Sequence, residues 1–579
     1  MSLFRLYKRF RPLDYVFLVC IAGLTVLQVW CTMLNVDYMS DFVTAIMYQQ
    51  TNDILYNCGM MVAVAFGTVA CQIVIAICAS SMTASLATKI RDEVYSRVND
   101  YGIGDIQKYS TASLITRTSN DIENVQMSTL MMLRMVLSAP VTAIWAICKI
   151  QEASAQLTWV VAVGVFVIVL SLVLVMIFVI PKFKVSQKVI DRLNQVTREG
   201  ITGVRVVRAY NAEGYQDEKF KKANDNLTKI NLFTGRALQL FNPIMTIVLD
   251  GVTLGIYAVG ASLMKSGEAQ YSVVVAFSSL SVQVIMAFMM LLFLFIMLPR
   301  AMVSAKRIDE VLRYEPTIKD PTNPVVPDES NKGLLTFNHV TFAYPDAEAP
   351  VVDDIDFKAE KGQTVAIIGE TGSGKSSIIN LIARLFDVTE GSVEIDGVDV
   401  RSMTQKELRS RIGFVPQKGN LFSGTVSENI AFGLETIDEE AVKKAAECAC
   451  ATEFISKMDG GFDAKIASGG TNVSGGQRQR LCIARAAAIN PEIFVFDDSF
   501  SALDFKTDKQ VRSNLKLFYP EATKVIVAQR VGTIMDADLI LVLDSGVVVG
   551  KGTHKELLSS CPQYRDIALS QLSKEELGL

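Results

Sequence analysis

The chain has 579 residues, of which 50% are hydrophobic, and a formal net charge of −4. Because a single hydrophobic core rarely grows past roughly 250 to 300 residues, this length predicts two or more structural units. Lysine and arginine are spread along the chain without forming a basic stripe, which argues against a DNA or RNA partner. The ten cysteines form no CxxC pair, so we predict thiols that pack as small hydrophobic groups, with neither metal nor disulfides.

Long apolar runs dominate the sequence before about residue 310, and short apolar runs alternate with Gly, Asp and Lys after it. The second pattern is typical of a soluble α/β domain. A helix needs about 20 apolar residues to cross the hydrocarbon core of a membrane. Six stretches meet this requirement: residues 15–36, 54–82, 132–150, 157–180, 241–264 and 273–298. We therefore predict an all-α membrane half with six spanning helices, followed by an α/β half.

The positive charges of the membrane half predict its orientation. The N-terminus, the segments 83–131 and 181–240 and the stretch after 298 carry nearly all of them, whereas residues 37–53 carry none. We expect a multi-pass protein of the cell membrane with both termini in the cytoplasm. Residues 3–11 mix aromatic and basic residues, which predicts a helix lying in the membrane interface; a solvated tail is the alternative.

The two long basic segments continue the helical periodicity of their neighbours far past the membrane boundary. We therefore predict long cytoplasmic helical extensions, each a hairpin. Each hairpin contains a break where a short turn and helix would fit, near residues 104–121 and near residues 209–220.

A predicted strand, a glycine-rich loop and a helix follow one another after residue 363. The loop reads Gly369, Glu370, Thr371, Gly372, Ser373, Gly374, Lys375, Ser376, Ser377. This order is the context of a phosphate-binding P-loop, because glycines let backbone N–H groups converge on phosphates at a helix N-terminus. Lys375 is then placed to reach the β and γ phosphate oxygens, and Ser376 to hold Mg²⁺. The motif alone indicates only a nucleotide.

Further motifs at orderly spacing narrow the class. They are Gln417 in RIGFVPQ, the run Val473, Ser474, Gly475, Gly476 and Gln477, the apolar strand that ends in Asp497, and Ser501 to Asp504. Together they resemble the Q-loop, signature, Walker B and D-loop motifs of the ABC superfamily, an α/β P-loop NTPase fold. The resemblance implies ATP and Mg²⁺ as cofactors, with Ser376, Gln417 and Asp497 at the metal. Tyr344 matches the adenine-stacking aromatic of the family, a buried core tyrosine being the alternative.

The whole chain resembles the exporter branch of that superfamily, in which a membrane domain precedes the ATP domain and the hairpin tips act as coupling helices. The resemblance implies an interfacial helix at 1–12, a membrane domain at 13–310, a linker at 311–333 and a nucleotide-binding domain at 334–579. In that family the P-loop of one chain and the signature of another hold each ATP together. A single copy of each motif therefore implies a dimer.

Two residues depart from the family's hydrolytic site. The family follows the Walker B aspartate with a glutamate, and Asp498 here would hold its carboxylate about 1.5 Å farther from the attacking water, which can cost on the order of a hundredfold in rate. Gln529 replaces a histidine near the γ-phosphate and cannot carry positive charge toward the transition state. Neutral drift is the alternative, but both changes affect one chemical step.

The signature, by contrast, is nearly whole, with only Val473 in place of the usual leucine. A weakened P-loop side and a good signature side resemble the degenerate-site half of bacterial heterodimeric multidrug exporters. The resemblance implies a partner: a second homologous half-transporter with an intact catalytic glutamate and histidine.

Candidate substrate-path residues lie in the last two predicted spans. Asp250 is the only carboxylate well inside a span, so it would contact a cationic compound or a proton, or else be a bonded structural residue. Gln283 and Met286 would line an adaptable cavity, with lipid-facing or core packing as the alternative. We predict ATP-driven export of hydrophobic or amphiphilic small molecules from the lipid bilayer. Lipid or peptide export, and a regulatory membrane protein that binds ATP without turnover, are the other hypotheses.

Overall fold

The structure is a computed structural model and describes residues 2–153, 155–345, 347–575 and 577. Contacts divide the chain into two compact units: a helical unit of residues 1–99 and 112–314, and an α/β unit of residues 100–111 and 315–579. The change of unit at Tyr314 falls inside the predicted linker. The short segment 100–111 belongs to the α/β unit although it lies between two long helices of the other unit, which the sequence did not predict.

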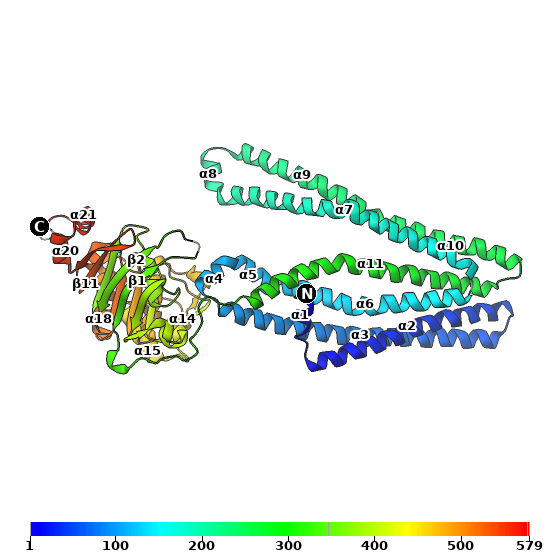
Figure 1. Ribbon diagram of the computed structural model, residues 1–579, viewed down its shortest axis with the longest axis horizontal. Coiled ribbons are helices and arrows are strands. Elements are labelled where there is room, and N and C mark those ends of the chain that lie inside the picture. The colour runs from blue at the N-terminus through cyan, green and yellow to red at the C-terminus, as the bar shows by residue number, and fades with distance from the viewer. Residues whose placement is uncertain (1, 154, 346, 576, 578–579) are drawn as a thin grey trace. The chain divides into compact units, whose positions relative to one another are not determined.

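Long α-helices and a few short ones build the helical unit, as Figure 1 shows. They are α1 (Ser2–Tyr7), α2 (Pro12–Met47), α3 (Thr51–Asn99), α5 (Thr111–Thr118), α6 (Asn120–Ala153), α7 (Ala155–Thr202), α8 (Val204–Ala209), α9 (Glu213–Gln239), α10 (Phe241–Lys265) and α11 (Tyr271–Arg313). Each of the six predicted spans lies within one of these helices. In the apolar window of α3 only 11% of the residues are buried, so most of its apolar side chains face outward, as in a helix surrounded by lipid.

Five helical stretches among the described residues are long and apolar enough to cross a membrane: Pro12–Met47, Thr51–Asn99, Thr111–Gln151, Pro243–Lys265 and Tyr271–Leu291. The fourth predicted span, 157–180, lies in α7, where Gln156–Ser171 forms a shorter apolar stretch. The side chains of residues 172, 175, 176, 179 and 180 lie outside the described part of the structure. The helices share a core in which Met33 of α2, Ile168 of α7 and Phe277 of α11 are buried.

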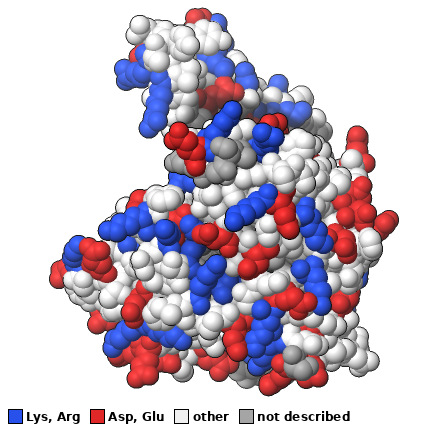
Figure 2. Space-filling view, turned by 90° about the vertical axis from the view of Figure 1, so that its left-hand side faces the viewer, with Lys and Arg blue, Asp and Glu red and all other residues white. Residues whose placement is uncertain are grey.

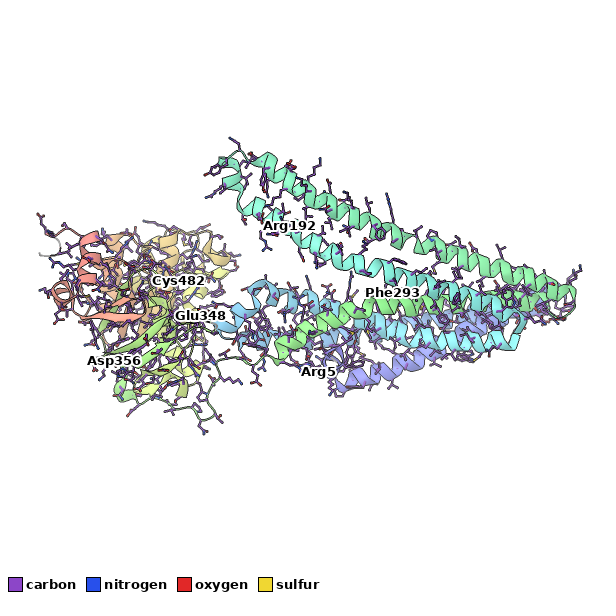
Figure 3. The ribbon with its side chains drawn as sticks, turned by 45° about the horizontal axis from the view of Figure 1, so that its top comes forward. Arg5, Arg192, Phe293, Glu348, Asp356 and Cys482 are labelled. Atoms are coloured by element: carbon purple, nitrogen blue, oxygen red, sulfur yellow. The ribbon has the colours of Figure 1, made fainter. Side chains whose placement is uncertain are left out.

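The helices α7 and α9 form a long hairpin with α8 at its tip (Figure 1). Lys219 of α9 pairs with Glu199 of α7 at 2.5 Å, and the Gln216 amide donates to the Val196 carbonyl at 3.0 Å. Figure 3 marks Arg192 on this polar part of α7, whereas Phe293 lies on the apolar part of α11.

The second predicted hairpin break, near 209–220, contains the turn, whereas the short helix lies before it. The short helix α8 covers Val204–Ala209, and residues 213–220, which the prediction assigned to the break, form the first turns of α9. The turn itself is at Asn211, whose φ of 50° is left-handed. The β-branched run before it, in spite of its low helix propensity, forms the short helix.

Three sheets form the strand framework of the α/β unit. A mainly parallel sheet has the order β12-β11-β3-β10-β9-β6, an antiparallel sheet has the order β2-β1-β4-β5, and β7 pairs with β8. The strands are β1 (Leu335–Phe342), β2 (Val352–Ala359), β3 (Thr364–Gly369), β4 (Glu390–Ile395), β5 (Val398–Asp399), β6 (Ile412–Val415), β7 (Gly424–Thr425), β8 (Lys465–Ile466), β9 (Ile493–Asp497), β10 (Thr523–Val527), β11 (Leu539–Asp544) and β12 (Val547–Gly552).

Helices cover the larger sheet on both faces. The helices of the α/β unit that follow β3 are α12 (Lys375–Ile382), α13 (Gln405–Ser410), α14 (Val426–Ile430), α15 (Glu439–Cys448), α16 (Thr452–Ile455), α17 (Gly475–Ala488), α18 (Phe505–Phe518), α19 (Val531–Ile534), α20 (His554–Ser560) and α21 (Pro562–Gln571). Because β3, β6, β9 and β10 run parallel, their carboxyl ends meet at one edge of the sheet. On the face of the molecule in Figure 2, acidic and basic side chains interleave without forming a basic patch.

The segment that precedes α5 docks its helix α4 (Ile103–Tyr109) within the α/β unit. Asp105, which is 2% exposed, accepts from the Thr317 hydroxyl at 2.5 Å and from the Thr317 backbone N–H at 3.1 Å. Gly104 lies so close to Phe386 that a Cβ there would stand 3.2 Å from the ring. The first predicted break, 104–121, thus contains a short helix packed against the α/β unit.

Candidate nucleotide-binding site

The loop between β3 and α12 needs glycine at particular positions. Gly374 has a φ of 97°, and a Cβ there would approach the Val351 carbonyl oxygen to 2.8 Å. Gly369 is tighter still, because a Cβ would stand 2.2 Å from the Leu543 carbonyl oxygen. Glycine at these two positions therefore lets the loop turn sharply into the N-terminus of α12, where a phosphate can bind.

Lys375, the first residue of α12, folds back over the loop. Its Nζ donates to the carbonyls of Gly369 and Glu370 at 2.9 and 2.5 Å, and lies 3.3 Å from the Ser373 hydroxyl. Burial lowers the pKa of Lys375, and the nearby carboxylates Asp498 and Asp497 act in the opposite direction. The lysine therefore lies in the loop that is predicted to hold the phosphates.

The Walker B strand brings a carboxylate to the P-loop. The first four residues of β9 are buried, and Asp497 at its end accepts from the Ser376 hydroxyl at 3.1 Å. Burial raises the pKa of Asp497, whereas the Ser376 hydrogen bond and the Lys375 charge lower it. A hydroxyl and a carboxylate side by side are the hard oxygen ligands that Mg²⁺ prefers, so these two residues fit the ion.

Two amides converge on the carboxylate of Asp498. Asp498 is 8% exposed and has a left-handed φ of 47°, and its backbone N–H donates to the Val527 carbonyl at 3.0 Å. Its Oδ2 accepts from Nε2 of Gln529 at 3.0 Å and from Nε2 of Gln417 at 3.4 Å. The structure thus joins three predicted site residues from the ends of three parallel strands, β9, β10 and β6.

Tyr344 lies beside the P-loop helix. Its hydroxyl is 3.0 Å from the Ser377 hydroxyl, and its ring meets Phe386 edge to face at a centroid distance of 5.1 Å. The side chain is half-buried, so one part of the ring remains accessible. Phe386 also contacts Gly104 of α4, so this ring lies between the predicted adenine-stacking residue and the docked helix.

The signature residues begin α17. Ser474 is the N-cap: its hydroxyl accepts from the Gln477 N–H at 3.3 Å, and its own N–H donates to the Gln477 side chain at 3.0 Å. A Cβ on Gly475 would meet no atom within 4 Å, and one on Gly476 would stand 3.4 Å from the Ala502 carbonyl oxygen. Ser474 and Gly475 are exposed, and partly buried Val473 packs on the core. An exposed helix N-terminus can accept an anion.

The D-loop residues stabilise the loop after β9. The Ser501 hydroxyl donates to the Asp498 carbonyl at 2.8 Å, and Asp504 caps α18 by accepting from the Thr507 N–H at 3.0 Å and hydroxyl at 2.7 Å. These bonds from Thr507 lower the pKa of the exposed Asp504. The Ser501 hydrogen bond thus fixes the backbone at Asp498 from within the same loop.

The three candidate substrate-path residues lie in different surroundings. Asp250 is exposed on α10, and Met286 is 49% exposed on α11. Gln283 lines a cavity of about 400 Å³, and its Oε1 is buried without a hydrogen-bond partner among the described residues. The other residues that line this cavity are Thr32, Asn35, Val36, Met39, Ala65, Thr68, Val69 and Ser279. The lining of this cavity thus mixes hydroxyl and amide groups with apolar side chains.

Sequence reasoning missed one residue at the site. The Gln571 side chain, at the end of α21, donates to the Gln529 carbonyl at 2.8 Å and accepts from the Val531 N–H at 2.8 Å. It holds both sides of the loop that carries Gln529. No motif surrounds Gln571, so only the fold connects it with the site.

Taken together, the α/β unit has the P-loop, Walker B strand and capped signature helix of an ATP-binding domain, joined in one chain to a helical membrane domain. Residues 16–288 match the ABC transporter transmembrane region, and residues 352–501 match the ABC transporter ATP-binding family. The chain therefore belongs to the ABC transporter family.

Relatives and a solved structure agree with this assignment. An uncharacterized ABC transporter ATP-binding protein of Mycobacterium tuberculosis is 36% identical over 523 residues, covering 89% of this chain and 90% of the relative. A probable multidrug resistance ABC transporter ATP-binding/permease protein of Bacillus subtilis is 31% identical over 471 residues, covering 79% and 78%. A bacterial Atm1-family ABC exporter with ATP bound has a similar fold, with a TM-score of 0.78, 22% identity, and coverage of 95% and 97%. The chain thus has the fold of an exporter half-transporter.

Proposed function

We propose that this chain is one half of a heterodimeric, ATP-driven efflux transporter and that its own ATP site hydrolyses slowly. The observation that carries the proposal is the contact of Asp498 with the Gln529 and Gln417 amides. In the family's hydrolytic site a longer glutamate and a histidine occupy the positions of Asp498 and Gln529. Here the shorter carboxylate accepts from two amides at its Oδ2, and hydrogen bonds that stabilise the ionised form make it a weaker base for water.

ATP binding does not depend on those groups. Lys375, the P-loop N–H groups and the Ser376–Asp497 pair provide cationic, donor and metal-binding groups for a triphosphate with Mg²⁺. Tyr344 would stack on the adenine. A site that keeps the groups that bind ATP but lacks the groups that hydrolyse it retains ATP. We base the proposed slow site on this difference between its binding groups and its hydrolytic groups.

The signature supports the heterodimer. Ser474 and Gly475 remain exposed at the start of α17, where a γ-phosphate held by a partner's P-loop would meet a hydroxyl and free N–H groups. A partner with an intact glutamate and histidine would form its competent site with this signature. Gln417 and the D-loop residues Ser501 and Asp504 complete the set of motifs that the family uses around each ATP.

Amphiphilic compounds are the proposed substrates. The cavity beside Gln283 joins hydroxyl and amide groups to apolar side chains at membrane depth, and Met286 on the same helix offers an adaptable apolar surface. The relative from Bacillus subtilis that is named a probable multidrug resistance transporter supports the same substrate class. The distribution of basic residues supports a plasma-membrane protein with both termini in the cytoplasm.

ATPase measurements on the purified chain, alone and with its partner, test the proposal. The chain alone should bind labelled ATP and turn it over on the order of a hundredfold more slowly than the complex. Lys375→Ala, which removes the phosphate-binding lysine, serves as the control for binding. Vigorous, drug-stimulated ATPase from the chain alone would show that the heterodimer proposal is wrong.

A further inference from the structure

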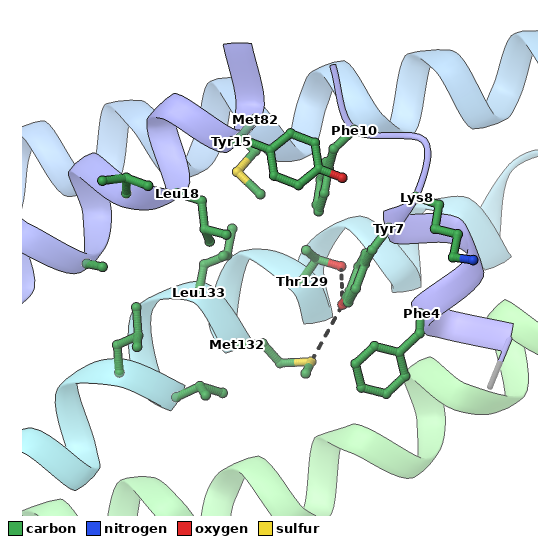
Figure 4. A pocket seen from close by; sticks show the side chains of 14 residues that line it. Phe4, Tyr7, Lys8, Phe10, Tyr15, Leu18, Met82, Thr129, Met132 and Leu133 are labelled. Carbon is green, nitrogen blue, oxygen red and sulfur yellow. Dashed lines mark hydrogen bonds between the residues drawn. The ribbon is translucent and has the colours of Figure 1, made fainter. Parts of the chain in front are cut away.

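An apolar pocket of about 660 Å³ lies between the N-terminal helix α1 and the membrane bundle, and Figure 4 shows it from close by. This volume lies within the range of roughly 300 to 1,000 Å³ that is usual for small-molecule sites. Its lining comes from α1, from the connection between α1 and α2, from the first turns of α2, from one residue of α3 and from α6. The lining residues include Phe4, Lys8, Val19, Met82, Met132 and Val136.

The polar groups inside the pocket are already paired. The Tyr7 hydroxyl lies 3.1 Å from the Thr129 hydroxyl and 3.9 Å from the Met132 sulfur (Figure 4). Thr129 in turn donates to the Val125 carbonyl at 2.7 Å, so Tyr7 is the donor to Thr129. An occupant therefore needs no hydrogen-bonding group in the interior. The lining suits a hydrocarbon chain.

Basic side chains in and next to α1 outnumber the carboxylates that pair with them. Arg5 pairs with Asp309 at 2.9 Å and Arg9 pairs with Glu93. Lys8, which lines the pocket, and the nearby Arg11 are exposed and have no ion pair among the described residues. The carboxylate next in sequence, Asp14, is 3% exposed and caps α2 by accepting from the Arg11 backbone N–H at 2.7 Å.

The pocket also lies at one particular depth of the membrane. It is lined by the beginning of the first predicted span, by Met82 at the end of the second and by residues around the beginning of the third. These three ends belong to the same side of the bundle, the side on which α3 and α6 extend past the membrane. The pocket therefore combines an apolar cavity with basic side chains, unpaired within the described part of the chain, at the boundary between the hydrocarbon core and the headgroups. A phospholipid fits this combination, because its acyl chains and its charged headgroup meet at that boundary.

We propose that this pocket binds one anionic phospholipid, with an acyl chain between α1 and α6 and the headgroup beside Lys8 and Arg11. The lipid would join α1 to the bundle on the face where Phe4 and Val19 are 75% and 72% exposed. The proposal concerns a bound lipid, distinct from the transported compound, and it does not depend on the slow ATP site.

Native mass spectrometry of the full-length chain, extracted from bilayers of equal phosphatidylglycerol and phosphatidylcholine with identical acyl chains, tests the proposal. The chain should retain one phosphatidylglycerol through detergent washing. Val136→Trp, which adds bulk at the pocket, should remove it, whereas Ile144→Trp, at a 65% exposed position on the same helix outside the pocket, should not. Lys8→Glu should lower the preference for phosphatidylglycerol on the order of tenfold or more, since one charge is removed and an opposite one added.

Lys188→Glu, at an exposed lysine of α7 far from the pocket in sequence, controls for the general effect of charge. Elution as a single folded species, with thermal unfolding like that of the wild type, establishes that the variants are intact. Equal retention of the two lipids by the wild type would overturn the assignment of an anionic ligand. Equal retention by Val136→Trp and Ile144→Trp would overturn the assignment of the pocket.

Discussion

Asp498 and Gln529 form one local arrangement. The Gln529 amide lies 3.0 Å from the Asp498 carboxylate, so a change at either position alters what the other can do. A glutamate at 498 would extend one methylene toward the site of the water, and a histidine at 529 would contact the γ-phosphate as in the family. Each single change leaves one half of the pair unsuited to hydrolysis, and this coupling makes the two effects non-additive.

The double change Asp498→Glu with Gln529→His should therefore restore hydrolysis to the chain alone. We expect the ATPase rate of the double variant to rise on the order of tenfold to a hundredfold. Each single variant should raise the logarithm of the rate by less than half as much as the double variant does. Steady-state phosphate release measures the rates. Asp544→Glu, an exposed aspartate at the end of β11, is the control for lengthening a carboxylate. A double variant no faster than the wild type would show that other groups limit the site.

At the scale of elements, the ends of the parallel strands explain why motifs so far apart in sequence meet. The sequence predicts this convergence, because β3 and β9 are apolar runs that end at the motif residues Gly369 and Asp497, and β10 ends two residues before Gln529. It also predicts the spans, since about 20 apolar residues are needed in a bilayer wherever the helix packs. The role of Gln571 could not be predicted, because its two hydrogen bonds are to backbone groups of the loop that carries Gln529. Every residue has such backbone groups, so the sequence of the loop does not indicate a partner.

The docking of α4 and the position of α8 show a second limit of sequence reasoning. Both helices are shorter than eight residues, so their own propensity decides little and packing or a single turn decides their position. At α4 the decisive contacts are the hydrogen bonds of Asp105 with Thr317. At α8 the left-handed turn at Asn211 sets its end.

Gln571 should position the loop that carries Gln529. Gln571→Ala removes two hydrogen bonds at an exposed site, so we expect a loss of about 1 kcal/mol in the stability of the α/β unit and weaker retention of ATP. Gln571→Glu keeps the acceptor for the Val531 N–H, so it should lose less stability and less ATP retention than Gln571→Ala. Thermal unfolding and nucleotide dissociation rates give the measurements. Gln563→Ala, an exposed glutamine of the same helix, is the control; identical behaviour of the two alanine variants would contradict the positioning role.

For the whole molecule, the two composite sites of the proposed heterodimer should respond differently to changes in this chain. Ser474→Ala weakens the signature that serves the partner's competent site, so it should lower the steady-state ATPase of the complex about tenfold or more. Asp498→Ala affects only the slow site and should change the rate by less than about twofold. Ser456→Ala, an exposed serine of the same unit, is the control. The reverse order of effects would mean that the slow and competent sites are exchanged.

The proposed slow site would act in the transport cycle through the ATP that it retains. If, as we propose, Lys375, Ser376 and Asp497 hold Mg-ATP and Asp498 and Gln529 are poorly suited to activating water, the nucleotide should stay through several turnovers of the other site. Bound ATP would keep the two ATP domains in contact and would bias the membrane domains toward one opening, provided that it binds the two states with different affinity. A merely decayed site would have no such effect.

A trapping experiment distinguishes these cases. The complex is loaded with labelled ATP, allowed several turnovers, and photocrosslinked through an azido-adenine group to identify which chain holds the label. We expect uncleaved triphosphate on this chain and mainly diphosphate on the partner, because only the partner's site has its hydrolytic groups. Lys375→Ala should abolish labelling of this chain, since the lysine supplies the positive charge at the phosphates. Diphosphate on the wild-type chain, or no label at all, would contradict a regulatory role for retained ATP and identify the site as a decayed one.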